Sequence, residues 1–530
     1  MSSMAPVLIA GSWRQASDAT GHFNAENPTT GAAIAGDFPV SGAADLEAAL
    51  SAAVDVAAEL AATPPERIAA FLEAYADGID AAADELIELA HAETALPREP
   101  RLAKAELPRT SGQLRQAAAA VRGYRWTQPV IDTAAGLRSH LAPLHKPVLV
   151  FGPNNFPYAF NAIAGSDFAS AIAARNPVIA KAHPSHPHTS RRLAEIAHAA
   201  LLATGLPPAA VQMLYHFDNE PGLRLCGDSR LGAIGFTGSR AGGLAIKAAA
   251  DRAGIPVYVE LSSVNPVFML PGILAEQGEA LAGEFFASCT MGSGQFCTNP
   301  GVVTVPTGAD GDAFVEAARQ RFAAASPSVV FSRGVLDHLA SNVDVLRAAG
   351  ADCLAGGARG NGPGYDYQPT LLSVDAATFL RNPAALQTEA FGPTSLLVRA
   401  ADIDTMVALA AAFEGNLTGT LYRAADGRDD AAWQRVAAAL RPRVGRLIAN
   451  RMPTGVAVSP AMNHGGPYPS TGHPGFTAVG MPAAIRRFAA LHSYDHVPDP
   501  LLPAELRDRN PGGVPRLVDG HWSDADLETA

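Results

Sequence analysis

The chain alternates between two patterns of apolar and polar residues. From about residue 42 to 120, apolar and charged residues recur at helical spacing, as in stretches 45–50 and 67–75. This spacing is typical of amphipathic helices. From Val148 onward, short apolar runs are each followed by a helical stretch, which predicts an α/β fold with a parallel, doubly wound sheet. The runs cover residues 148–151, 178–180, 211–214, 231–236 and 257–259.

Two other regions interrupt this alternation. Polar residues surround Gly136 within the segment from about 124 to 146, which predicts an extended hairpin or arm. A second alternating region runs from about 271 to 445, and residues 453–482 are rich in glycine and proline. A length of 530 residues is enough for two or three units that each bury a core.

Composition narrows the class of protein. The chain is 48% hydrophobic and 17% charged, as in a soluble globular enzyme. A net charge of -12 argues against a nucleic-acid partner. The apolar runs are too short to span a membrane, and the first residues lack the pattern of a secretory signal. With only 4 cysteines as well, a reducing cytoplasm is expected.

Cys297 is the first candidate for chemistry. It lies among small and polar residues in the stretch 294–301, where a thiol would be open to a substrate. The alternative is a small buried hydrophobe. Glu260 follows the apolar run 257–259, at a strand end where active sites collect in α/β sheets. It is either a general base that activates water or a solvated carboxylate, and only the fold could bring it to Cys297.

Polar residues follow the other apolar runs. Asn155 could donate a hydrogen bond to an oxyanion, whereas Asn154 is better explained as a turn that caps the next helix. Lys181 follows the run 178–180. Gly238 comes before a helix that begins near Ser239, whose free N–H groups suit a phosphate. Glu389 and Phe391 precede a Gly-Pro pair, where a simple turn would also explain them.

Taken in order, these motifs resemble the NAD(P)-dependent aldehyde dehydrogenase superfamily. They are Asn155-Phe156-Pro157, Lys181, Phe236-Thr237-Gly238-Ser239, Glu260-Leu261, Gly294-Gln295-x-Cys297 and Glu389-x-Phe391-Gly392-Pro393. Segments 181–187, 453–456, 464–469 and 516–520 look like the 2,5-dioxovalerate (α-ketoglutarate semialdehyde) dehydrogenase branch. That branch is also similar to NADP-dependent long-chain aldehyde dehydrogenases.

The resemblance implies an organisation in four parts. Residues 1–123 and 147–262 would form a Rossmann-type dinucleotide-binding domain, and residues 263–455 an α/β catalytic domain. Residues 124–146 would be an oligomerisation arm. Residues 456–530 would pack on the cofactor domain and the dimer interface. A cytoplasmic homodimer or homotetramer without a metal ion is expected.

The resemblance also implies roles in a reaction. Cys297 would attack an aldehyde to give a thiohemiacetal and then a thioester. Asn155 and the Cys297 backbone N–H would hold the oxyanion, and Glu260 would activate water to release the acid. Glu389 and Phe391 would lie at the nicotinamide end of the cofactor, with Gly238 and Ser239 at its phosphates.

Cofactor choice depends on the adenosine end, where the resemblance places Lys181. NAD-preferring relatives carry an acid three residues after this lysine, and here that position is Pro184. With His183 and Arg240 as further cations, NADP is expected and NAD is possible.

The substrate expected from the resemblance is α-ketoglutarate semialdehyde, with a long-chain or other aliphatic aldehyde as the alternative. A catalytically silent structural relative is the alternative from another class. Arg451 could grip a distal carboxylate or could lie at the surface.

Overall fold

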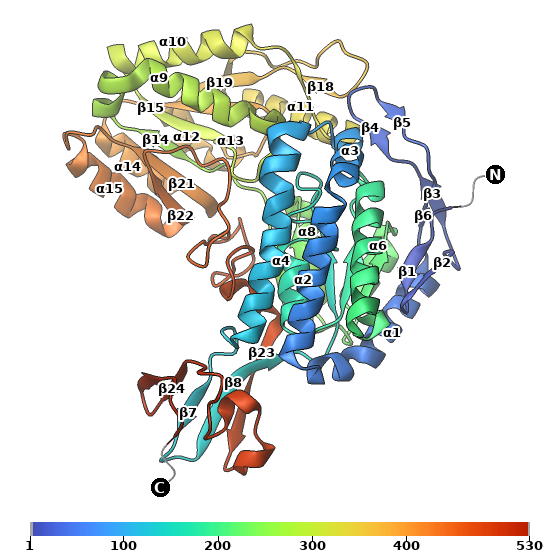
Figure 1. Cartoon of the computed structure of the whole chain (residues 1–530). Helices are drawn as coiled ribbons and strands as arrows, with labels where there is room; N and C mark the ends of the chain where they lie inside the picture. The colour runs from blue at the N-terminus through green and yellow to red at the C-terminus, as the bar shows by residue number, and fades with distance from the viewer. Residues whose placement is uncertain (1–3, 528–530) are drawn as a thin grey trace.

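The computed structural model describes residues 4–527 and contains three large sheets (Figure 1). Two sheets of seven strands form the two lobes of the molecule, and a five-stranded sheet projects from them at the bottom of the view.

The first sheet contains all five of the apolar runs that the sequence indicated. Its parallel strands are β9 (Val148–Phe151), β10 (Val178–Lys181), β11 (Val211–Leu214), β12 (Ala233–Thr237) and β13 (Val257–Glu260). They lie in the order β13-β12-β9-β10-β11, and β1 (Val7–Ile9) and β2 (Ser12–Arg14) extend the sheet with antiparallel pairing. Continuous apolar runs suit these strands because both faces of the sheet are covered.

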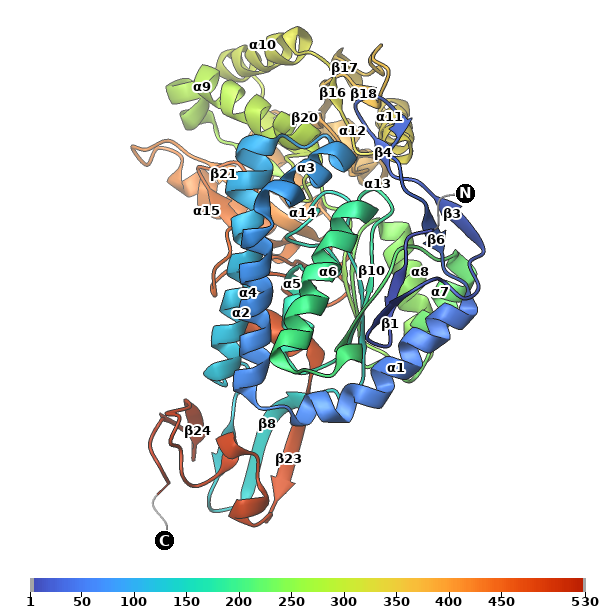
Figure 2. The same ribbon diagram turned by 45° about the vertical axis from the view of Figure 1, so that its right-hand side comes forward.

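Helices cover both faces of this sheet, as a doubly wound fold requires. The 42–120 region forms α1 (Ala43–Ala62), α2 (Pro65–Ala81), α3 (Ala83–Thr94) and α4 (Leu107–Arg122). Figure 2 shows α2 and α4 beside α6 (Pro187–Thr204) in front of the sheet. Behind it lie α7 (Asn219–Cys226) and α8 (Arg240–Asp251), and α5 (Ser166–Ala173) joins β9 to β10.

The strand order places a crevice between β9 and β12. From β9 the chain adds β10 and β11 on one side, and it later adds β12 and β13 on the other. The loops that leave β9 and β12 therefore diverge to opposite faces of the sheet. Ligands of open α/β sheets bind at the carboxyl ends of strands at such a switch point.

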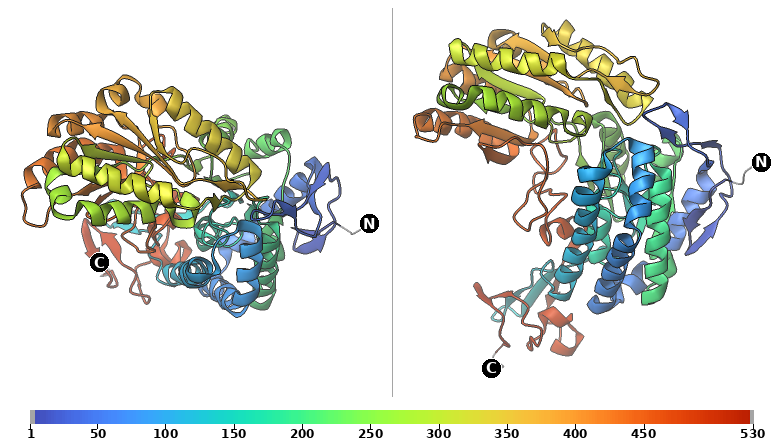
Figure 3. Two further views of the ribbon diagram at one scale, coloured as in Figure 1. Left: turned by 90° about the horizontal axis from the view of Figure 1, so that it is seen from above. Right: turned by 45° about the horizontal axis from the view of Figure 1, so that its top comes forward.

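The second sheet has the order β17-β19-β20-β15-β14-β21-β22. Its strands are β14 (Val267–Met269), β15 (Val302–Pro306), β17 (Asp352–Ala355), β19 (Thr370–Asp375), β20 (Thr394–Ala400), β21 (Asn416–Tyr422) and β22 (Val444–Ala449). Two separate apolar cores lie against it. One contains residues of α9 (Pro271–Thr290) and α10 (Ala309–Ala324), and the other contains residues of α14 (Ile403–Ala412) and α15 (Asp430–Leu440). The view from above in Figure 3 shows this layered lobe beside the first one.

The predicted arm forms a hairpin of β7 (Val130–Asp132) and β8 (Leu137–Pro143). The C-terminal tail completes its sheet with β23 (Ala489–Asp495), β24 (Arg516–Val518) and β25 (His521–Ser523). The sequence pattern predicted the arm and the tail as separate segments. In the structure their strands pair within one sheet. Their assignment to a subunit interface stays a prediction.

Within residues 4–527, we find no helix that combines the length and the apolar character needed to cross a bilayer.

One buried carboxylate fixes the start of α6. Glu93 of α3 accepts hydrogen bonds from the backbone N–H groups of His188 (2.8 Å) and Thr189 (2.9 Å), and from the Thr189 hydroxyl (2.7 Å). Burial raises the pKa of Glu93 to about 7, against the lowering effect of these bonds.

Replacing Glu93 with Ala is expected to cost about 2–4 kcal/mol, because it leaves buried donors without an acceptor. The matched control is Glu85→Ala, which removes an exposed carboxylate from a surface ion pair with Arg192 and should cost less than about 1 kcal/mol. Thermal unfolding followed by circular dichroism compares the two variants. Equal unfolding temperatures would show that Glu93 does not hold α6.

Candidate active site

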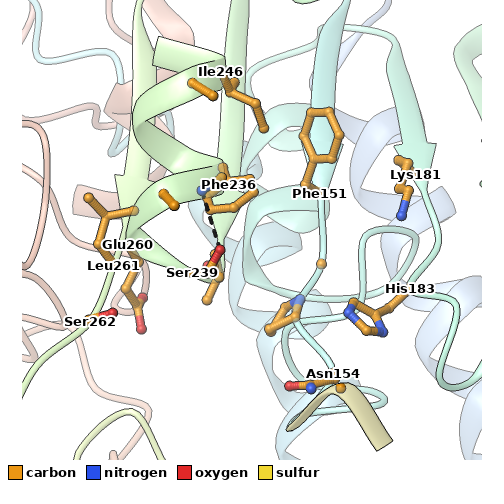
Figure 4. A pocket seen from close by; sticks show the side chains of 18 of the residues that line it. Phe151, Asn154, Lys181, His183, Phe236, Ser239, Ile246, Glu260, Leu261 and Ser262 are labelled. Atoms are coloured by element: carbon orange, nitrogen blue, oxygen red, sulfur yellow. Dashed lines mark hydrogen bonds between the residues drawn. The ribbon is translucent and has the colours of Figure 1, made fainter. Parts of the chain in front are cut away.

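A cavity of about 780 Å³ opens at the switch point of the first sheet. Its walls come from loops at the carboxyl ends of β9, β10, β12 and β13, and from the second lobe (Figure 4). Nine of the ten residues singled out in the sequence line it: Asn155, Lys181, His183, Gly238, Ser239, Glu260, Cys297, Glu389 and Phe391. Asn154, which a turn alone would explain, lines it as well.

The loop that carries Cys297 is shaped by close backbone packing. Gly294 has a φ of +68°, and a Cβ there would collide with the carbonyl oxygen of Gly392. The side-chain nitrogen of Asn265 donates to the carbonyls of Cys297 (2.8 Å) and Asn299 (2.9 Å). The thiol is therefore held by its backbone, and Asn265 is a positioning residue that sequence reasoning missed.

Cys297 lies beside two buried residues, Glu260 and His464. The Nε2 atom of His464 is 2.9 Å from Oε1 of Glu260 and 3.5 Å from the Cys297 sulfur. The other carboxylate oxygen of Glu260, Oε2, is buried without a hydrogen-bond partner among the described residues. The fold thus brings together the thiol and the carboxylate that lie 37 residues apart, and it adds a histidine between them.

A C-terminal loop brings His464 to this position. The backbone N–H of Leu261 donates to the carbonyl of Ser470 (2.8 Å), which fastens the loop to the end of β13. The N–H of His464 itself donates to the hydroxyl of Thr477 (3.0 Å). The sequence showed His464 only as part of a Gly- and Pro-rich motif, with no sign that it meets Glu260.

Electrostatics keep the thiol protonated at neutral pH. Burial raises the pKa of Cys297 well above its usual value, and the nearby Glu260 raises it further. The positive charge of Arg109 opposes both effects. Because the thiolate is the nucleophilic form, attack requires a base in contact with the sulfur. The imidazole of His464, which also contacts Glu260, lies in that position.

The same three groups could in principle hold a metal ion. Their sulfur, nitrogen and oxygen donors lie within 4.8 Å of one another. A metal-free site therefore stays a prediction of the sequence.

Asn155 is buried between the loop after β9 and the cysteine loop. Its side-chain nitrogen donates to the carbonyl of Gln295 (3.1 Å), two residues before Cys297. The backbone carbonyl of Asn155 accepts a hydrogen bond from the guanidinium of Arg101 (2.9 Å). The amide is thus fixed next to the nucleophile, with a second N–H available to a ligand.

The far end of the cavity suits phosphate groups. Ser239 caps the start of α8, where its hydroxyl accepts from the N–H of Gly242 (3.3 Å). The free N–H groups of a helix start favour an anion. A Cβ at Gly238 would come within 2.9 Å of the Phe236 ring. Glycine at this position therefore lets the backbone pass close to that ring. Figure 4 shows Ser239 between the loops after β9 and β13.

Charge at this end comes chiefly from Lys181. Burial lowers its pKa to about 8, so the amine is still mostly protonated at pH 7. Burial also lowers the pKa of His183 well below its usual value and that of His216 to about 4, so both imidazoles are neutral. Asp218, an exposed acid, lines the same end of the cavity.

Arg240 differs from the sequence expectation. Both terminal nitrogens of its guanidinium contact the carboxylate of Glu414 at 2.9 Å. The residue is absent from the described lining of the cavity. Its charge is therefore already balanced, because α8 turns this side chain toward the second lobe.

Glu389 and Phe391 line the cavity from the second lobe. Burial raises the pKa of Glu389 to about 7, while hydrogen bonds from Ser262 and Ser263 lower it. Its backbone carbonyl accepts from the side chain of Asn342 (2.8 Å). A carboxylate in a cavity wall can accept further hydrogen bonds from the hydroxyl groups of a ligand.

Three further arginines are candidates for a role near the Cys297 thiol. Arg451, the sequence candidate, is exposed. Arg109 and Arg446, which the sequence did not single out, each interact electrostatically with Cys297. Only the tertiary structure places these two beside the nucleophile.

A profile of the aldehyde dehydrogenase family matches residues 13–488 of the chain. The chain is 42% identical to alpha-ketoglutaric semialdehyde dehydrogenase 2 of Azospirillum brasilense, over 94% of this chain and 96% of that protein. It is 36% identical to alpha-ketoglutaric semialdehyde dehydrogenase of Acinetobacter baylyi, over 86% and 88%. PnpE of Pseudomonas sp. WBC-3, solved with nicotinamide adenine dinucleotide, shares the fold, with a TM-score of 0.77, 22% identity and coverage of 93% and 97%.

Replacing Glu260 with Gln is expected to make the Cys297 thiol more acidic. The substitution removes the negative charge that raises the pKa of the thiol, so the thiolate should form at lower pH. Alkylation of Cys297 by iodoacetamide, followed by peptide mass spectrometry across a pH series, measures this midpoint. Exposed Cys353 serves as the internal control and should not shift. An unchanged or higher midpoint at Cys297 would contradict the electrostatic coupling.

Proposed function

The chain belongs to the aldehyde dehydrogenase family and is an aldehyde-oxidising enzyme, and we propose that it converts α-ketoglutarate semialdehyde to α-ketoglutarate with NADP. The observation that carries the chemistry is the contact of a buried thiol with a buried His464–Glu260 pair at the wall of a large cavity. The substrate rests on the two semialdehyde dehydrogenases that resemble the chain over most of its length.

The first step forms a bond between the Cys297 sulfur and the aldehyde carbon. With its ring proton on Nδ1, His464 accepts the thiol proton at Nε2, and the new N–H then faces Oε1 of Glu260 at 2.9 Å, whose negative charge stabilises the imidazolium. The carbonyl oxygen becomes an oxyanion. The amide of Asn155 and the backbone N–H of Cys297 donate to it, and each such donor contributes about 2.7–4 kcal/mol to transition-state stabilisation.

The walls of the cavity fit a nicotinamide dinucleotide. The start of α8 with Gly238 and Ser239 would hold its phosphates, Lys181 its adenosine ribose, and Glu389 the hydroxyls of the nicotinamide ribose. When bound, the cofactor supplies the hydride acceptor that turns the thiohemiacetal into a thioester.

Glu260 then acts as the base for hydrolysis. Its unpartnered Oε2 can take a proton from water while that water attacks the thioester carbon. The carbon–sulfur bond breaks, and the carboxylic acid leaves. A glutamate at this place therefore favours a free acid as the product.

We also propose that the chain forms a cytoplasmic homodimer or homotetramer through the sheet that carries the arm. Large apolar side chains are exposed on four of its strands: Val130 (39%), Leu137 (42%), Leu491 (69%) and Trp522 (69%). Its edge strands β23 and β25 each pair with a strand on one side only within the described chain. Open edges and exposed apolar residues favour association with a second copy.

Replacing Glu260 with Gln is expected to separate the two half-reactions. The variant should give a first-turnover burst of reduced nicotinamide close to one per active site, because His464 is still present to accept the thiol proton during attack by the sulfur. Steady-state turnover should fall by about 10²–10⁴-fold, because the thioester loses its base. Rapid-mixing absorbance measures both phases, and Cys297→Ser is the control without a burst. Steady-state turnover at the wild-type rate would exclude Glu260 as the hydrolytic base.

NADP is expected to give a higher kcat/KM than NAD with the semialdehyde. Lys181→Met should lower kcat/KM for NADP about 10-fold or more while changing that for NAD much less, because a 2′-phosphate loses its cation. In the wild type, kcat/KM for NADP should fall as the pH rises through about 8, where Lys181 loses its charge. Equal losses with both cofactors in the variant would argue that Lys181 does not read the 2′-phosphate.

A further inference from the structure

Arg109 of α4 is a guanidinium without hydrogen-bond partners for two of its nitrogens. It lies over the rings of Phe156 (5.6 Å to the ring centre) and Phe160 (5.1 Å). Its Nε and Nη2 atoms are buried, and neither has a hydrogen-bond partner within residues 4–527. Leaving such donors buried and unpaired is costly, and more so for a charged group. The arrangement suits an anionic ligand.

Two other arginines of this region, Arg101 and Arg446, already have partners for some of their nitrogens. Arg101 forms an ion pair with the carboxylate of Glu106. Arg446 donates through Nη2 to backbone carbonyls of the loop 453–455, at 3.1 and 3.2 Å. These two residues therefore hold loops in place and each leave one buried nitrogen, Nε, without a partner, whereas Arg109 leaves two.

The nearest acid is not available to balance Arg109. Glu106 is fully buried, and one of its oxygens accepts from the backbone N–H groups of Tyr158 (2.9 Å) and Ala159 (3.1 Å). The other oxygen contacts Arg101. Both oxygens are thus engaged, and no ion pair joins Arg109 to a carboxylate within residues 4–527.

The rings beneath Arg109 border the reacting groups. The Phe160 ring centre is 5.7 Å from that of His464, and the Phe156 ring centre is 5.5 Å from that of Phe296, which precedes the nucleophile. The charge of Arg109 also lowers the pKa of Cys297. Its own pKa is lowered to about 10 by burial, so it is protonated at neutral pH.

We propose that Arg109 binds the carboxylate of the substrate at the end remote from the aldehyde. This inference rests on the proposed function. In α-ketoglutarate semialdehyde, four carbon–carbon bonds of about 1.5 Å separate the aldehyde carbon from the carboxylate carbon, which spans roughly 5 Å. A planar guanidinium fork pairs with a carboxylate through two parallel hydrogen bonds. Arg109 would thus select a charged chain beside the rings of Phe156 and Phe160.

Kinetics with a matched pair of five-carbon aldehydes tests this assignment. Arg109→Met keeps an unbranched side chain that can cover the rings and removes the guanidinium with its charge. Its kcat/KM for α-ketoglutarate semialdehyde should fall by about 10²–10³-fold, while kcat/KM for pentanal should fall by no more than about 10-fold, because pentanal loses only the effect of the charge on the acidity of the thiol. Arg451→Met, which removes the exposed arginine that the sequence suggested, is the control and should leave both values unchanged.

The outcomes separate the two levels of the proposal. If the wild type does not prefer the semialdehyde over pentanal, the proposed substrate is wrong. If the wild type has this preference and Arg109→Met keeps it, the substrate stands and the role of Arg109 is overturned.

A second measurement uses the wild-type enzyme and does not depend on how the variant folds. Phenylglyoxal modifies arginines, and peptide mass spectrometry reads the rate at Arg109 with and without α-ketoglutarate. Protection of Arg109 with unchanged labelling of Arg451 is expected. Equal labelling of Arg109 in both samples would overturn the assignment.

Discussion

The contact of His464 with Glu260 is the interaction on which the site depends. It joins the end of β13, in the first lobe, to a C-terminal loop that returns from the second lobe. The cysteine loop packs against both. The thiol of Cys297 therefore faces the imidazole of His464, which also contacts the carboxylate of Glu260. Taking these groups out of water is costly, and the cost is offset because each lies within hydrogen-bond reach of another.

Burial around this contact divides the cavity into two chemical environments. At the thiol, low solvation raises the pKa of Cys297 and strengthens hydrogen bonds to any charged group bound there. At the far end, Lys181 and the start of α8 present positive charge without a nearby carboxylate that binds them. One end is thus suited to covalent chemistry and the other to holding a phosphate-bearing ligand.

The arginines around the site differ in the partners that the fold gives them. Arg101 and Arg446 are fastened by acids or carbonyls, and Arg240 is balanced by Glu414. Arg109 alone among these four has two buried nitrogens that lack partners in the described chain. A guanidinium kept in that state over two aromatic rings is suited to an anionic partner.

The sequence by itself determined the sheet, the candidate nucleophile and nine of the residues that line the cavity. Apolar runs at strand spacing and polar residues after each run are local patterns, and parallel strands bring their carboxyl ends to one edge. His464 as a neighbour of Glu260, Arg109 beside the thiol, the diversion of Arg240 to Glu414, and the joining of the tail to the arm were decided only by the tertiary structure. Each of these is a contact between residues far apart in the chain, and the spacing of residues along a sequence carries no information about which distant side chains the packing of two lobes will bring together.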